Sequence, residues 1–153
     1  MNAKKIFLVL GWSLALTVTQ LSSAMAACTI STTPVNFGAY DVFSSVATDS
    51  TGTVTYNCGR GDRNITIALD RGGAPTFNPR RMLKVAEALN YNLYRDAART
   101  TIWGDGTGGT QSYFDSNPPN NTNVTVTIYG RVPAGQDVSV GLYTNSVAAT
   151  INF

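Results

Sequence analysis

The two cysteines are the residues with the most definite chemistry in this chain. Cys28 and Cys58 are the only cysteines among 153 residues, and the chain contains no histidine. Two thiols without a histidine make a poor ligand set for a metal ion, whereas an even pair is typical of a disulfide in proteins that leave the cytoplasm. We therefore expect Cys28 and Cys58 to be bonded to each other, and we expect no metal site.

The other patterns that could support catalysis are weak. The lack of histidine excludes Ser-His-Asp and Cys-His arrangements, and Glu87 is the single glutamate available for acid–base chemistry. The run from Gly104 to Gly109 matches the spacing of phosphate-binding G-x-G-x-x-G loops. However, no apolar strand pattern precedes this run and no helix pattern follows it. The sequence therefore predicts a protein that is not an enzyme and that holds no cofactor.

The N-terminal residues have the pattern of a secretory signal peptide. Two lysines in the first five residues precede an apolar run at 6–21, and residues 24–26, Ala-Met-Ala, suit a signal peptidase. The apolar run, about 16 residues, is shorter than the roughly 20 needed to span a membrane. We expect a signal peptide at 1–26 and a mature domain at 27–153 without a membrane span, exported through the periplasm to the cell surface or the medium. A lipoprotein anchored at Cys28 is the alternative, but it would leave Cys58 unpaired.

The charge balance argues against two classes of partner. The chain has 11 Lys and Arg against nine Asp and Glu, and two of the lysines lie in the predicted signal peptide. Nucleic acids and anionic membranes both select a surplus of basic residues. We therefore expect neither to be the main partner.

Most of the mature chain consists of short segments in which apolar and polar residues alternate, as in half-buried β-strands. We expect strands at 35–42, 53–58, 65–69, 89–93, 124–128, 138–142 and 147–153. Residues 80–89 are compatible with one or two helical turns, and the polar segments 71–79 and 104–123 have the composition of loops. Six or seven short strands separated by turns predict an all-β antiparallel sandwich.

Several short motifs also occur in a characteristic order. They are VNFGAYD at 35–41, GTVTYNC at 52–58, LNYNLYRD at 89–96, WGDG at 103–106, YGRVPAGQ at 129–136 and GLYTNSV at 141–147. In this order they resemble the spore coat protein U domain. That family includes subunits of archaic chaperone–usher pili of Gram-negative bacteria and a secreted spore-coat protein.

The resemblance implies an immunoglobulin-like sandwich that is incomplete, because its last strand comes from another molecule. In such pili the gap is filled by a periplasmic chaperone and then by the N-terminal extension of a neighbouring subunit, and assembly uses an outer-membrane usher. The end of this chain agrees, since its final alternating segment has no successor to pair with. By analogy, the residues expected near the strand-accepting groove are Val138, Val140, Leu142, Ile151 and Phe153.

One departure from the family pattern concerns the strand that a subunit donates. Only Ala27 lies between the predicted cleavage site and Cys28, whereas donor subunits carry an alternating apolar extension there. We therefore expect an accepting subunit that is terminal or tip-like. The alternative is a self-sufficient secreted coat or surface protein, or a small adhesive module. In that case Trp103, Tyr113 and Phe114 are the candidate surface contacts, although Trp103 also suits a core position.

Overall fold

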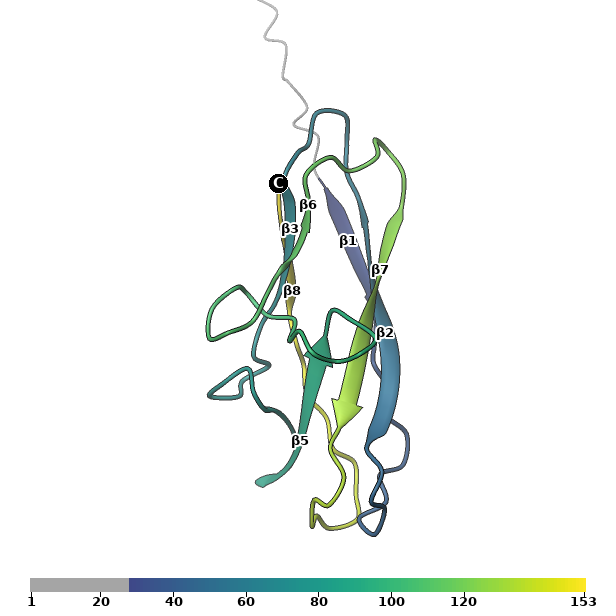
Figure 1. Ribbon diagram of the computed structural model, residues 1–153, viewed down its shortest axis with the longest axis vertical. Helices are drawn as coiled ribbons and strands as arrows, with labels where there is room; N and C mark the ends of the chain where they lie inside the picture. Colours follow the sequence, from purple (N-terminus) through teal and green to yellow (C-terminus); the bar gives the residue numbers. More distant parts are fainter. Residues whose placement is uncertain (1–27) are drawn as a thin grey trace, which may run out of the picture.

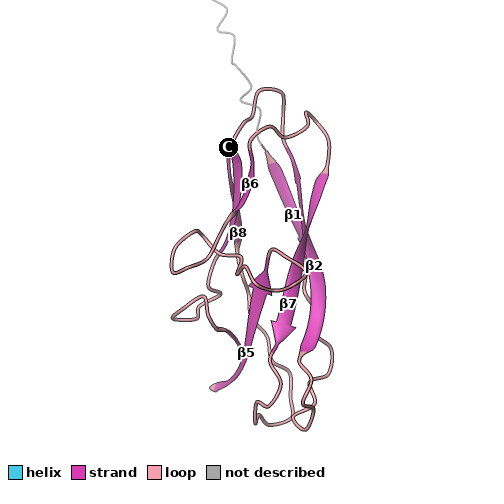
Figure 2. Cartoon of the chain, in the orientation of Figure 1, coloured by secondary structure: helices cyan, strands magenta, loops and turns pink. Residues whose placement is uncertain are grey.

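A computed structural model describes residues 28–153, so the predicted signal peptide lies outside the described range. Every regular element in this range is a β-strand (Figure 2). The strands are β1 (Thr29–Thr33), β2 (Thr48–Asn57), β3 (Ile65–Leu69), β4 (Arg80–Lys84), β5 (Glu87–Tyr94), β6 (Tyr113–Asp115), β7 (Val124–Val132) and β8 (Ala149–Asn152). Among the described residues, no helix has the length and apolar character needed to cross a membrane.

The strands form two antiparallel sheets that make the two layers of a sandwich (Figure 1). One sheet has five strands in the order β1-β2-β7-β5-β4, and the other has three in the order β6-β3-β8. The longest pairing joins β2 to β7, from Thr48 opposite Val132 to Tyr56 opposite Val124. These sheets confirm the predicted all-β antiparallel sandwich.

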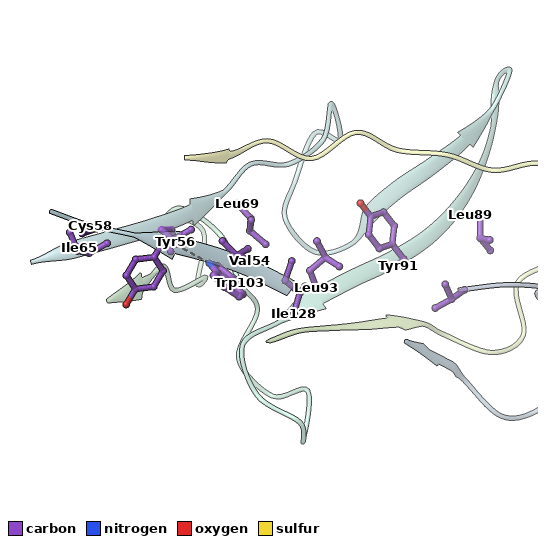
Figure 3. Close-up of a cluster of buried hydrophobic side chains, with 12 residues drawn as sticks. Val54, Tyr56, Cys58, Ile65, Leu69, Leu89, Tyr91, Leu93, Trp103 and Ile128 are labelled. Carbon is purple, nitrogen blue, oxygen red and sulfur yellow. Dashed lines mark hydrogen bonds between the residues drawn. The ribbon is translucent and has the colours of Figure 1, made fainter. Parts of the chain in front are cut away.

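Alternating side chains of facing strands build the core. In β2, Val54 and Tyr56 are buried while Thr53, Thr55 and Asn57, which alternate with them, are more exposed. From the opposite sheet, Ile65, Ile67 and Leu69 of β3 belong to the same buried cluster (Figure 3). The period of two in a strand therefore places one apolar face of each sheet against the other.

A buried arginine joins the two layers. Arg80 is fully buried, and its Nε donates a hydrogen bond to the carbonyl oxygen of Asp70 at 2.9 Å. Its terminal nitrogens donate to Asn92 Oδ1 at 3.0 Å and to the carbonyl oxygen of Trp103 at 2.6 Å. Asp70 follows β3, whereas Arg80 and Asn92 belong to β4 and β5, so one side chain connects both sheets. Burial lowers the pKa of Arg80, but a guanidinium remains protonated across the range in which proteins fold.

The predicted disulfide between Cys28 and Cys58 is confirmed. It joins the residue before β1 to the residue after β2, at one end of this strand pair. No free cysteine is left among the described residues.

The structure corrects several predicted elements. Residues 80–89 form a hairpin of β4 and β5 rather than helical turns, because Val85 adopts a positive φ of 55° that closes a tight turn between the strands. The segments 35–42 and 138–142 are not regular strands, and the predicted loop at 104–123 contains β6. The last predicted strand is confirmed in its central part as β8.

Candidate strand-binding groove

Two strand edges are unpaired on the same side of the sandwich. In the described range β1 pairs only with β2, and β8 pairs only with β3, so each strand is the outer member of its sheet. Such an edge carries a row of backbone N–H and C=O groups that can pair with a further strand.

A groove lies between the segments that continue these two edges. Its narrower part has a volume of about 370 Å³ and runs between residues 32–37 and 143–149. Its wider part has a volume of about 630 Å³ and runs between 34–43 and 138–144. The two parts share Pro34, Val35, Phe37, Met82, Tyr143 and Thr144, so they form one continuous depression, which we call the groove.

Two glycines explain why the chain after β1 turns into the groove. A Cβ atom at Gly130 of β7 would lie 2.6 Å from Val35 and 2.7 Å from Phe37. A Cβ atom at Gly52 of β2 would lie 2.8 Å from Val35. The missing side chains therefore leave room for Val35 and Phe37 to lie against the five-stranded sheet. Because these residues pack inward, the predicted strand at 35–42 is replaced by an irregular wall of the groove.

The opposite wall is an extended segment whose inner face is incompletely covered. Side chains alternate between half-buried and exposed from residue 143 through β8, and the half-buried ones are Tyr143, Asn145, Val147, Ala149 and Ile151. The inward residues of β3 are fully buried by comparison. The inner face of this segment is therefore less well covered than that of β3.

The structure divides the predicted groove residues into two groups. Val138, Val140 and Leu142 line the wider part of the groove. Ile151 packs against the core and Phe153 is 55% exposed, but neither lines the groove, because β8 continues beyond its narrow end.

The side chains at the wider end differ in how far they are covered. Val138 is half-buried against the core, whereas Val140 is 95% and Leu142 is 81% exposed. Phe43 lines the same part of the groove and is 95% exposed. Large apolar side chains in water at the mouth of a groove are typical of an interaction site.

Sequence analysis missed several residues of the groove. Phe37 and Tyr91 contact each other edge to face, with ring centroids 5.8 Å apart, and both line the narrower part. Met82 lines both parts. The alternation of Val35 with Phe37, and of Tyr91 with Leu93, was visible in the sequence, but it does not distinguish a groove from a closed core.

The candidate contacts of the adhesive alternative are placed differently from one another. Trp103 is fully buried, and its indole N–H donates to the carbonyl oxygen of Ile67 at 2.9 Å. A surface role for Trp103 is therefore wrong, because its polar atom and its ring are both used in the core. Tyr113 is half-buried against Trp103, and only Phe114, which is 55% exposed, projects into solvent.

A polar network fastens the wall of the wider part to the β4–β5 hairpin. The backbone N–H of Ser139 donates to Glu87 at 2.7 Å, and Lys84 donates to the carbonyl oxygen of Val140 at 2.6 Å. Tyr143 donates its hydroxyl to the carbonyl oxygen of Ser139 at 2.9 Å. The hydrogen bonds that Glu87 accepts from the hydroxyl and the backbone N–H of Ser139 lower its pKa to about 2.

This network predicts a loss of stability in acid. A carboxyl whose pKa is lowered in the folded state stabilises the fold above its ordinary pKa of 4.5, and this contribution disappears as the pH falls toward 2. We expect the free energy of unfolding to decline over this window. Denaturant melts at a series of pH values should show a smaller decline for Glu87→Gln, and the remainder comes from other carboxyls such as Asp96, whose pKa is also lowered to about 2. Asp137→Asn is the matched control. This carboxyl lies two residues before Ser139, is exposed, and accepts no hydrogen bond in the described structure. An unchanged pH profile for Glu87→Gln would contradict the assignment.

Comparison with known proteins finds a matching family model and a related protein. The family model of the Spore Coat Protein U domain matches residues 13–150. "Protein U" of Myxococcus xanthus is 34% identical over 132 residues, which are 78% of this chain and 71% of that protein.

A solved structure with the same fold comes from a pilus assembly system. It is the CsuC-CsuE chaperone–tip adhesion subunit pre-assembly complex from archaic chaperone–usher Csu pili of Acinetobacter baumannii. One of its chains matches with a TM-score of 0.58 and 19% identity, over 84% of this chain. The match spans only 40% of that longer chain, and at this identity it shows the fold alone.

Proposed function

Because the chain belongs to the Spore Coat Protein U domain family, we propose that it is a non-enzymatic, exported structural subunit of a chaperone–usher type surface pilus. In this role its groove accepts a β-strand from a neighbouring subunit. The observation that carries the proposal is the groove itself, which lies between two unpaired strand edges and has a half-exposed apolar wall. The likeness of the fold to the Csu pre-assembly complex supports it.

Strand addition suits the physical character of this groove. Backbone hydrogen bonds to the edges of β1 and β8 would provide affinity, and alternate side chains entering the depression would provide selectivity. The inserted strand would also cover Val147 and Ala149, whose inner faces are half-exposed without it. An occupied groove thus completes the core and removes an edge that is prone to aggregation.

The proposed partners follow from this role. They are a periplasmic chaperone that covers the groove before assembly, an outer-membrane usher, and the neighbouring pilus subunits. The disulfide between Cys28 and Cys58 supports passage through an oxidising compartment on the way to the cell surface. A terminal or tip-like position remains a prediction from the short segment between the predicted cleavage site and Cys28.

The test is a denaturant melt of the chain recovered from the periplasm of an expression host, with and without a synthetic peptide. The peptide carries valine at every second position and polar residues between. We expect it to raise the unfolding midpoint, because a ligand at 100 times its Kd adds about 2.7 kcal/mol to the free energy of unfolding. A peptide of the same composition in scrambled order is the control.

Two variants of the chain make this test specific to the groove. Val147→Asp places a charge on the half-buried inner face and should abolish the response to the peptide. Thr150→Asp places the same charge on the exposed side of β8 and should retain it. A stable monomer that ignores the peptide would refute strand acceptance and favour the self-sufficient coat or surface protein.

A further inference from the structure

A polar pair crosses the otherwise largely apolar floor of the groove. Asn145, on the extended segment before β8, donates a hydrogen bond from Nδ2 to the hydroxyl oxygen of Tyr91 at 2.9 Å. Tyr91 belongs to β5 in the five-stranded sheet, and Figure 3 shows its hydroxyl directed toward the yellow C-terminal segment. Both residues line the narrower part of the groove, among apolar side chains such as Leu69, Leu93 and Ile128.

The surrounding structure holds this pair in place. A Cβ atom at Gly72 would lie 2.6 Å from Oδ1 of Asn145, so the amide rests directly against the glycine backbone. On the other side of the pair, the ring of Tyr91 is 4% exposed and packs edge to face on Phe37. The two polar groups therefore have fixed positions and cannot turn away when the groove is covered.

The pair has hydrogen-bonding capacity that the described residues do not use. Oδ1 of Asn145 accepts no hydrogen bond, and the hydroxyl of Tyr91 accepts one from Asn145 but donates none. In the open groove, water can satisfy both atoms. A strand that fills the groove removes this water. An apolar side chain at that level would then leave Oδ1 of Asn145 without a donor and the O–H of Tyr91 without an acceptor.

We propose that the strand accepted by this groove carries a hydroxyl side chain, serine or threonine, at the inward position that meets Asn145 and Tyr91. A hydroxyl is the matching group because it can donate to Oδ1 of Asn145 and accept from the hydroxyl of Tyr91 at the same time. Asn145 is thus a specificity-determining residue that fixes the register of an otherwise apolar strand. This inference rests on the proposed function, in which the groove accepts a strand.

A scan with paired peptides tests the proposal on the chain recovered from the periplasm. The host peptide carries valine at every inward position, and in each member of the panel threonine replaces one of these valines. Valine and threonine have nearly the same shape, so each comparison isolates one hydroxyl. We expect threonine at one inward position to bind about tenfold more tightly than valine, which corresponds to one buried hydrogen bond. At the other inward positions threonine should weaken binding.

Variants of the chain assign the effect to the pair. Asn145→Leu should reverse the preference at that one position in favour of valine. Tyr91→Phe removes a single hydroxyl and should reduce the preference for threonine, which keeps the test decisive if Asn145→Leu does not fold. If the host peptide binds and threonine weakens binding everywhere, the proposed selectivity is wrong while strand acceptance stands. If no peptide of the panel binds, strand acceptance itself fails.

Discussion

Replacing Arg80 with alanine is expected to lower the free energy of unfolding by about 3–5 kcal/mol, enough to unfold a marginally stable domain. The reason is that Arg80 is fully buried and donates hydrogen bonds to Asp70, Asn92 and Trp103. Its removal leaves a cavity between the sheets and takes away the side-chain donor of the carbonyl oxygens of Asp70 and Trp103. Denaturant melts of the purified variant measure the effect.

Two neighbouring variants separate this effect from a general loss of charge. Arg81→Ala removes the adjacent arginine of β4, which is exposed, and should change the stability little. Arg80→Lys keeps the charge but replaces a planar fork of donors with a single ammonium group, and should recover only part of the loss. If Arg80→Ala and Arg81→Ala had equal stability, the guanidinium would not be the link between the layers.

The large expected effect of Arg80 on stability is explained by incomplete packing on the side of the sandwich that contains the groove. A complete sandwich is held together by side chains packed between both sheets along their whole width. Here the inner faces of Val147 and Ala149 are only half-covered, so packing is incomplete on the side of the groove. The hydrogen bonds of Arg80, and the bond from Trp103 to the carbonyl oxygen of Ile67, fix the distance between the layers at the centre. We infer that these links hold the two sheets together where side-chain packing is incomplete.

The sequence predicted the sheet architecture because alternation reports which face of a strand is buried. In the strands expected at 53–58 and 65–69, Val54, Tyr56, Ile65 and Ile67 alternate with polar residues, and the structure buries all four. The disulfide was predicted for a different reason, namely that Cys28 and Cys58 are the only cysteines in the chain.

Other features could not be predicted because they depend on three-dimensional neighbours. The alternation of Val138, Val140 and Leu142 suggested a regular strand, but this segment follows the wall of the groove, and two of the three side chains point into water. Nothing in the local sequence separates buried Arg80 from exposed Arg81. The pairing of Asn145 with Tyr91 joins residues 54 positions apart, and it appears only when the segment before β8 packs against β5.

Attaching a strand to the end of the chain is expected to have the largest stabilising effect. β8 ends at Asn152, and an Asn-Gly turn after Phe153 would let a new strand run back antiparallel along the free edge of β8. The new strand carries alternating valines, with threonine at the position selected by the peptide scan. We expect the free energy of unfolding to rise by about 4 kcal/mol, since a millimolar effective concentration is about 1,000 times a micromolar Kd.

The same variant shows whether the attached strand stabilises the chain by occupying the groove or in some other way. If the attached strand occupies the groove, the chain should no longer respond to added peptide, and Val147→Asp should cancel most of the gain. A tail of equal length made of glycine and serine should give neither effect, because it cannot pair or fill the depression. Stabilisation that persisted in the Val147→Asp variant would mean that the strand binds elsewhere, and the groove would lose its proposed role. Stabilisation confined to the alternating tail would support a sandwich that accepts one more strand in the groove.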